Sequence, residues 1–194
     1  MPDVLAARNG DVNLHVERFG DPADPALVLV NGLGSQCTNF AVGLCERFVA
    51  EGVQVVRFDN RDTGLSSKLD GVEYSLADMA DDVVALLDAV GVQRAHVLGT
   101  SLGGMVVQRM AIDHPDRLLT MTSVMSRTGE PGYGDSTPEA MAVLTAPPAR
   151  SREEHIEAHA AAIGVYGSKP EWIDGAETRA RAAAAYDRCW YPEG

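Results

Sequence analysis

One serine in this chain has the neighbours that a catalytic nucleophile requires. Ser101 lies at the centre of residues 99–103, a G-x-S-x-G pattern with Gly99 and Gly103 at its ends. An apolar strand pattern precedes it and a helix pattern follows, which is the context of a nucleophile elbow. A serine on so tight a turn has strained backbone, and the flanking glycines let the chain segments pass. We therefore predict that Ser101 is a nucleophile.

Two backbone N–H groups are predicted to bind the oxyanion that such a nucleophile creates. The Leu102 N–H begins the helix after Ser101, where unpaired donors and the positive end of the helix dipole favour negative charge. A second glycine-flanked loop, residues 31–34, directly follows a buried-strand pattern. By position we assign the Leu33 N–H, beside Gly32, as the second donor. A plain loop whose glycines only turn the chain is the alternative.

Alternating strand and helix patterns must position these groups. A hairpin is predicted over residues 4–19. Apolar strand patterns at 26–30, 53–58, 95–98 and 118–125 then alternate with helix patterns at 36–50, 75–90 and 102–113. Continuously apolar strands separated by helices are typical of parallel sheets with helices on both faces. The predicted fold class is therefore α/β, with a doubly wound, mostly parallel sheet.

The composition changes after this alternating region. Residues 129–138 are rich in Gly and Pro, and the remainder is Ala-rich with helical spacing at 137–145, 152–163 and 170–190. We predict an α/β core over 1–128 and a helical cap over 129–194, lying on the carboxyl edge of the sheet where open α/β folds bind ligands. Aromatic side chains of the cap either line an apolar pocket or form the cap's own core; they are Tyr166, Trp172, Tyr186, Trp190 and Tyr191.

Charged and histidine-containing stretches give weaker signals. The loop 59–66 is rich in Asp and Arg, and we favour internal hydrogen bonds that pin the loop over a catalytic role. His155 and His159 lie four residues apart on one predicted helix face, but the stretch lacks the H-E-x-x-H pattern. A solvated or packed pair is favoured over a zinc site. We predict no metal and no cofactor, and none of the five histidines is placed as the base of Ser101.

Composition excludes several function classes. A formal net charge of −12 disfavours nucleic acid as a partner. We find no apolar run long enough to span a membrane and no signal-peptide pattern at the start. The three cysteines are an odd number without C-x-x-C spacing, which indicates reduced thiols and predicts a cytoplasmic location.

Four stretches together resemble the α/β-hydrolase superfamily: residues 29–34, 57–66, 74–82 and 96–104. Within it the chain is similar to the bacterial carboxylesterase and lipase-like branch that includes anthracycline methyl esterases. The resemblance implies a serine hydrolase that acts on a small-molecule carboxylic ester through an acyl-enzyme. Asn31 stands where many members have His, and Asp62 where many have Gly. The alternatives are a non-catalytic binding module of the same fold and a cofactor-free haloperoxidase-like enzyme.

The same resemblance implies that part of the catalytic machinery lies outside this sequence. In the family the triad acid and histidine follow two later strands, beyond the cap. The chain therefore looks like the N-terminal portion of a longer hydrolase, and we expect it to be close to inactive alone. Without later strands, residues 118–125 become an exposed apolar edge and stability is marginal. The expected partner is the missing C-terminal portion as a second polypeptide, or a second copy in a homo-oligomer.

Overall fold

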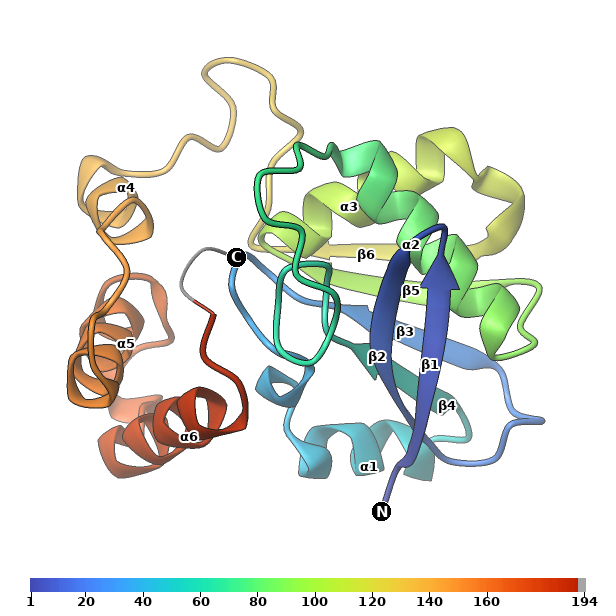
Figure 1. Ribbon diagram of the computed structural model, residues 1–194, viewed down its shortest axis with the longest axis horizontal. Coiled ribbons are helices and arrows are strands. Elements are labelled where there is room, and N and C mark those ends of the chain that lie inside the picture. Colours follow the sequence, from blue (N-terminus) through green and yellow to red (C-terminus); the bar gives the residue numbers. More distant parts are fainter. Residues whose placement is uncertain (192–194) are drawn as a thin grey trace. The chain divides into compact units, whose positions relative to one another are not determined.

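The computed structural model describes residues 1–191 and divides into two compact units (Figure 1). The first unit is Met1–Tyr133 and carries every strand of the described chain. The second begins at Gly134 and is helical. Each unit is described separately below.

A single six-stranded sheet organises the first unit. Its strands are β1 (Asp3–Asn9), β2 (Val12–Phe19), β3 (Ala26–Val30), β4 (Gln54–Phe58), β5 (Ala95–Thr100) and β6 (Leu118–Val124), in the spatial order β1-β2-β4-β3-β5-β6. The β1–β2 hairpin turns at Gly10, whose φ is +58°, and β2 pairs antiparallel with β4. The pairs β4–β3, β3–β5 and β5–β6 are parallel. The predicted mostly parallel sheet is confirmed.

Two apolar cores cover the two faces of this sheet. Successive strand residues point to opposite faces, so Val28 belongs to one core and Leu29 to the other. Helices α2 (Leu76–Ala89) and α3 (Leu102–Asp113) pack on the face of Val28, whereas α1 (Val42–Ala50) packs on the face of Leu29. Figure 1 shows α1 below the strands and α3 above them. The doubly wound arrangement is therefore confirmed.

One predicted helix is interrupted. The pattern at 36–50 predicted a continuous helix, but the chain forms a single 3₁₀ turn, η1 (Cys37–Asn39), and then starts again as α1. Phe40, between them, is extended, with φ −79° and ψ 93°. The Arg57 Nη1 donates to the Phe40 carbonyl, and the Cys37 N–H donates to Asp59 Oδ1 at 2.6 Å. These long-range hydrogen bonds hold the segment in a shape that helical periodicity alone does not reveal.

Strand β6 is an exposed edge of the sheet. Of its seven residues only Leu118 is buried, and Leu119, Met121 and Val124 are each more than 40% exposed. No described strand pairs with its outer side. The expectation of an exposed apolar edge is confirmed, and such edges are templates for pairing with another chain.

Up to residue 191 the second unit contains three α-helices and one 3₁₀ turn. They are α4 (Pro138–Leu144), α5 (Arg152–Tyr166), η3 (Pro170–Trp172) and α6 (Gly175–Arg188). The predicted helix 170–190 is divided because the Asp174 side chain caps α6, accepting hydrogen bonds from the Ala176 and Glu177 N–H groups. Bidentate ion pairs Arg152–Asp187 and Arg179–Glu157 join α5 to α6. In the described residues no helix is long and apolar enough to cross a membrane.

A cluster of rings lies between α5 and the end of α6. The His155 ring lies 4.6 Å from the Trp190 ring and 5.7 Å from the Tyr186 ring, centroid to centroid, and His159 stacks on it at 6.3 Å. Tyr186 and Trp190, both partly exposed, therefore pack against His155 within the second unit, whereas the Trp172 side chain is 72% exposed. Burial lowers the pKa of His155, and burial, then the charges of His155 and Arg181, lowers the pKa of His159.

These two lowered pKa values predict that acid destabilises the second unit. Below the ordinary histidine pKa of 6.5 the unfolded chain binds protons that folded His155 and His159 resist, so stability falls as pH drops from there. The measurement is thermal unfolding between pH 7.5 and 5.5, followed by Trp190 fluorescence in a Trp172→Phe background. A His155→Gln/His159→Gln variant should lose much of the pH dependence. An equal dependence in both proteins would contradict the prediction.

Candidate active site

Ser101 lies in the strained turn that its motif predicts. Strand β5 ends at Thr100 and α3 begins at Leu102, with Ser101 between them at φ 52° and ψ −119°. A positive φ is costly for a residue with a side chain and persists only where neighbours enforce it. Here the Ser101 N–H donates to the Val124 carbonyl at 2.9 Å, and the Ser101 carbonyl accepts from the Gly104 N–H at 2.9 Å. Both sides of the turn are thus held.

Glycines make this turn sterically possible. A Cβ on Gly99 would lie 2.7 Å from the Gly104 nitrogen, and one on Gly103 would lie 2.6 Å from the Asn31 carbonyl oxygen. Real Cβ atoms do not approach backbone so closely, so neither position accepts a side chain. Residue types two places before and after Ser101 are therefore fixed by backbone contact.

The loop after β3 lies against the serine. A Cβ on Gly32 would be 3.2 Å from the Ser101 Cβ and 3.8 Å from its Oγ, so the loop passes directly over this side chain. The loop turns through Gly34, at φ +64°, with the Ser35 N–H donating to the Gly32 carbonyl at 3.2 Å. The Leu33 side chain at the tip is 63% exposed. The predicted loop and nucleophile are thus neighbours.

Both predicted oxyanion donors have uncommitted N–H groups. Leu102 is the first residue of α3, a position whose N–H has no acceptor within the helix. Within residues 1–191 neither the Leu102 nor the Leu33 N–H donates to a protein acceptor, and Ser101 Oγ makes no hydrogen bond. The catalytic roles of Leu33, Leu102 and Ser101 stay a prediction.

Histidines of the first unit have other partners. The His15 Nε2 lies 3.2 Å from Glu17 Oε1, the His96 Nδ1 lies 2.8 Å from Thr120 Oγ1, and the His114 Nε2 lies 2.7 Å from Asp81 Oδ1. None of these three hydrogen-bonds to Ser101. The other two belong to the ring cluster of the second unit, as described above.

The charged loop after β4 is pinned by its own hydrogen bonds. The buried Asp59 carboxylate accepts from the Cys37 N–H at 2.6 Å and from the Leu65 N–H at 2.9 Å. The Ser66 hydroxyl donates to the Asp59 carbonyl at 2.6 Å. The internal hydrogen bonds predicted for residues 59–66 are present.

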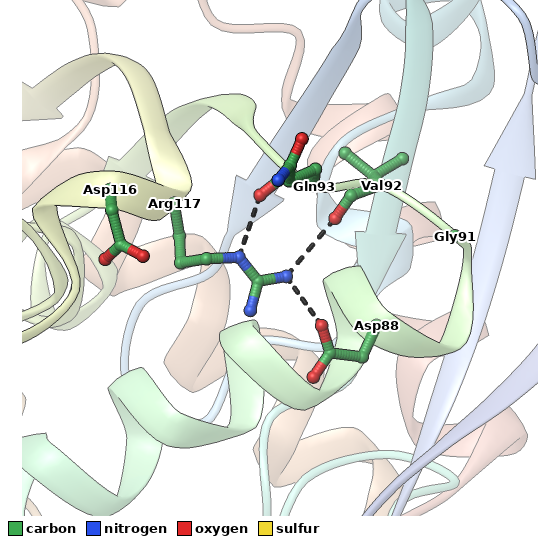
Figure 2. Close-up of a pocket in the computed structure, with 6 residues that line it drawn as sticks. All are labelled: Asp88, Gly91, Val92, Gln93, Asp116 and Arg117. Carbon is green, nitrogen blue, oxygen red and sulfur yellow. Dashed lines mark hydrogen bonds and ion pairs between the residues drawn. The ribbon is translucent and has the colours of Figure 1, made fainter.

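A cavity of about 570 Å³ lies at the end of the strands opposite to Ser101 (Figure 2). It opens beside the amino ends of β5 and β6, whereas Ser101 follows the carboxyl end of β5. Figure 2 shows Arg117 clamped there, donating to the Gln93 carbonyl at 2.8 Å and to Asp88 Oδ1 at 2.7 Å. The arginine is engaged in holding two chain turns together, so this cavity is separate from the predicted chemistry.

Sequence reasoning missed a cluster of ligand-type side chains. His15, Glu17 and Cys37 place one nitrogen, oxygen or sulfur atom each within 4.8 Å of one another. The strand period puts His15 and Glu17 on the same face of β2, which was a readable signal. Cys37 was assigned to a continuous helix, and its position opposite β2 depends on the 3₁₀ turn.

A doubly wound sheet whose strand turns through a strained serine into a helix defines a class of protein. It is the class of α/β hydrolases that carry a nucleophile elbow. Comparison with known proteins agrees. A family model described as the alpha/beta hydrolase fold matches residues 25–174, and the chain belongs to that family. The resemblance inferred from the four sequence stretches is confirmed.

Two curated relatives and one solved structure illustrate the likeness. Rhodomycin D methylesterase DnrP of Streptomyces peucetius is 42% identical over 119 residues, which are 60% of this chain and 40% of the relative. Putative carbamate hydrolase RutD of Caulobacter vibrioides is 30% identical over 181 residues, covering 92% of this chain and 64% of that protein. A hydrolase from Pseudomonas aeruginosa PA01 superimposes with a TM-score of 0.66 at 27% identity, over 96% of this chain and 68% of its own. The chain thus spans less than two thirds of either curated relative.

Proposed function

We propose that this chain carries the nucleophile and oxyanion site of a serine hydrolase acting on small-molecule carboxylic esters. The observation that carries the proposal is the left-handed backbone of Ser101 between β5 and α3, with Gly32 passing over its side chain. The names of the two relatives, a methylesterase and a putative carbamate hydrolase, both describe hydrolysis at a carbonyl carbon and support acyl transfer.

The proposed reaction has two halves. Ser101 Oγ attacks the ester carbonyl while a base takes its proton, and the N–H groups of Leu33 and Leu102 bind the resulting oxyanion. The intermediate collapses, and the alcohol leaves with that proton. Water then attacks the acyl-enzyme and releases the carboxylic acid, which restores the serine. No step in this scheme uses a cofactor.

The base and its orienting acid are proposed to come from polypeptide beyond these 194 residues. The three histidines of the first unit are engaged with Glu17, Thr120 and Asp81 rather than with Ser101. A serine without its base loses most of its reactivity, so the chain alone is expected to turn esters over very slowly.

Strand β6 is the proposed attachment point for that polypeptide. Its outer side is unpaired in the described sheet and presents the exposed side chains of Leu119, Met121 and Val124. A second polypeptide that adds a strand here completes the sheet, and a second copy of this chain is the other arrangement. We propose that the helical second unit is a cap that shapes substrate choice. We also propose the reducing cytoplasm as the location, because the chain has an odd number of cysteines.

Two experiments test the proposal together. Native mass spectrometry of folded protein determines whether the 20.7 kDa chain occurs alone or with a second polypeptide. A fluorophosphonate probe is then mapped by peptide mass spectrometry on both forms. We expect the adduct on Ser101 in the assembled form and much less on the chain alone.

The outcomes separate the alternatives. An assembled protein that neither labels at Ser101 nor hydrolyses esters supports a non-catalytic binding module. Labelling at Ser101 with peroxide-dependent bromination faster than ester hydrolysis supports a haloperoxidase-like enzyme. A monodisperse monomer of 20.7 kDa with full esterase activity contradicts the proposed division of the catalytic groups.

A further inference from the structure

Three side chains of different chemistry meet on the α1 side of the sheet. His15 and Glu17 are two residues apart on β2, and Cys37 approaches from η1. Their nearest ligand atoms all lie within 4.8 Å of one another, with His15 Nε2 at 3.2 Å from Glu17 Oε1. Glu17 and Cys37 are buried and His15 is half-buried, so one side of the cluster is open to entry from solvent.

This set of donors is the one that zinc prefers. Imidazole nitrogen, thiolate sulfur and carboxylate oxygen bind Zn²⁺ at about 2.0–2.3 Å, which places ligand atoms about 3.3–3.8 Å apart in a tetrahedral site. Closing separations of at most 4.8 Å to that range requires side-chain movement of about 1 Å or less. A thiolate among the ligands selects a borderline-soft cation over magnesium or calcium.

Arg57 fixes the carboxylate in a way that suits a ligand. Its Nε and Nη2 donate to Glu17 Oε2 at 2.9 and 2.5 Å, which leaves Oε1 directed at His15. The carboxylate is therefore held by an outer partner, as metal-binding carboxylates commonly are.

We propose that His15, Glu17 and Cys37 bind one divalent cation of the zinc type, with water in the remaining position. Cys37 lies shortly after the loop 31–34 that carries Leu33, and its N–H donates to Asp59. A bound cation therefore ties that loop to β2. The proposal concerns folding and loop rigidity and stands independently of ester chemistry.

The test uses metal content and stability rather than activity. The chain is stripped with a chelator, refilled with Zn²⁺ and desalted, and zinc per chain is measured. Loading with Co²⁺ adds a thiolate-to-cobalt absorption band that reports Cys37 directly. We expect about one zinc per chain, the cobalt band, and a higher unfolding temperature with metal than without it.

Substitutions assign the ligands. Cys37→Ser and His15→Gln should each lower zinc affinity by about 100-fold or more, since removing outer partners alone costs 10–100-fold. Cys45→Ser is the matched control, because Cys45 is equally buried but its Sγ lies 3.7 Å from the Phe40 carbonyl, outside the cluster. His96→Gln is the control for His15.

Contrary results are equally clear. Failure of the unsubstituted chain to retain zinc or to gain stability from it shows that the cluster is a hydrogen-bonded ion pair only. Equal zinc retention by the Cys37→Ser and Cys45→Ser proteins overturns the assignment as well. Should Cys37→Ser fail to fold, which circular dichroism reveals, the His15→Gln variant carries the same test.

Discussion

Replacing Ser101 by alanine is expected to lower kcat/KM for carboxylic esters by about 10⁴- to 10⁶-fold in the assembled protein. The hydroxyl is the only group in the proposed scheme that forms a covalent bond to the acyl carbon. Alanine has no atom to replace it, and the remaining rate comes from substrate binding and the oxyanion donors. The measurement is p-nitrophenyl ester hydrolysis, with fluorophosphonate labelling as a second readout.

Ser126→Ala is the matched control for that substitution. The Ser126 Oγ is buried beside Gly104 and has no hydrogen-bond partner within the described chain, so its removal leaves no new polar group unpaired. Activity within about 2-fold of the unsubstituted protein is expected, given the near-neutral cost of such a change. Retention of more than about 1% activity by a folded Ser101→Ala protein would remove Ser101 from the proposed mechanism.

The second large effect is on stability, at Gly103. Alanine there is expected to cost about 3 kcal/mol or more in the free energy of unfolding, because its Cβ would meet the carbonyl oxygens of Val30 and Asn31. These are backbone atoms of a central strand and of the loop over Ser101, and they have no rotamer through which to yield. Urea unfolding of the two proteins measures the difference.

Gly43→Ala is the control that separates the close backbone contact at Gly103 from the general effect of replacing glycine by alanine. Gly43 is the second residue of α1 as Gly103 is the second residue of α3, yet a Cβ on Gly43 would have nothing within 4 Å. Alanine at Gly43 is expected to be stabilising by about 0.5–1 kcal/mol through helix propensity. Similar losses at both positions would mean that the helix start, and not the close approach, sets the cost.

The sequence predicted the parts of this molecule that depend on neighbours along the chain. The hairpin over residues 4–19, the helix pattern at 75–90 and the turn at Ser101 each follow from a few adjacent residue types. The alternation of strand and helix patterns then sufficed for the doubly wound sheet. These features are local, so periodicity and turn chemistry reveal them.

Features created by contacts between distant residues were not predictable in this way. The break before α1 depends on Arg57 and Asp59, which lie beyond it in the chain and reach back to Phe40 and Cys37. The meeting of Cys37 with β2 follows from that break. The sequence pattern indicated only that His15 and Glu17 share a face of β2. Two candidate ligands without a third are too few to predict a metal site.

Because the Ser101 N–H donates to the Val124 carbonyl, the exchange rate of this amide proton depends on whether the end of β6 stays in place. Val124 ends β6, and no strand within residues 1–191 pairs with the outer side of β6. Deuterium uptake at the amide of Ser101 should therefore follow the fraying of β6, and it should slow when another strand pairs with the outer side of β6. The Ser101 amide thus reports whether a further strand has paired with β6.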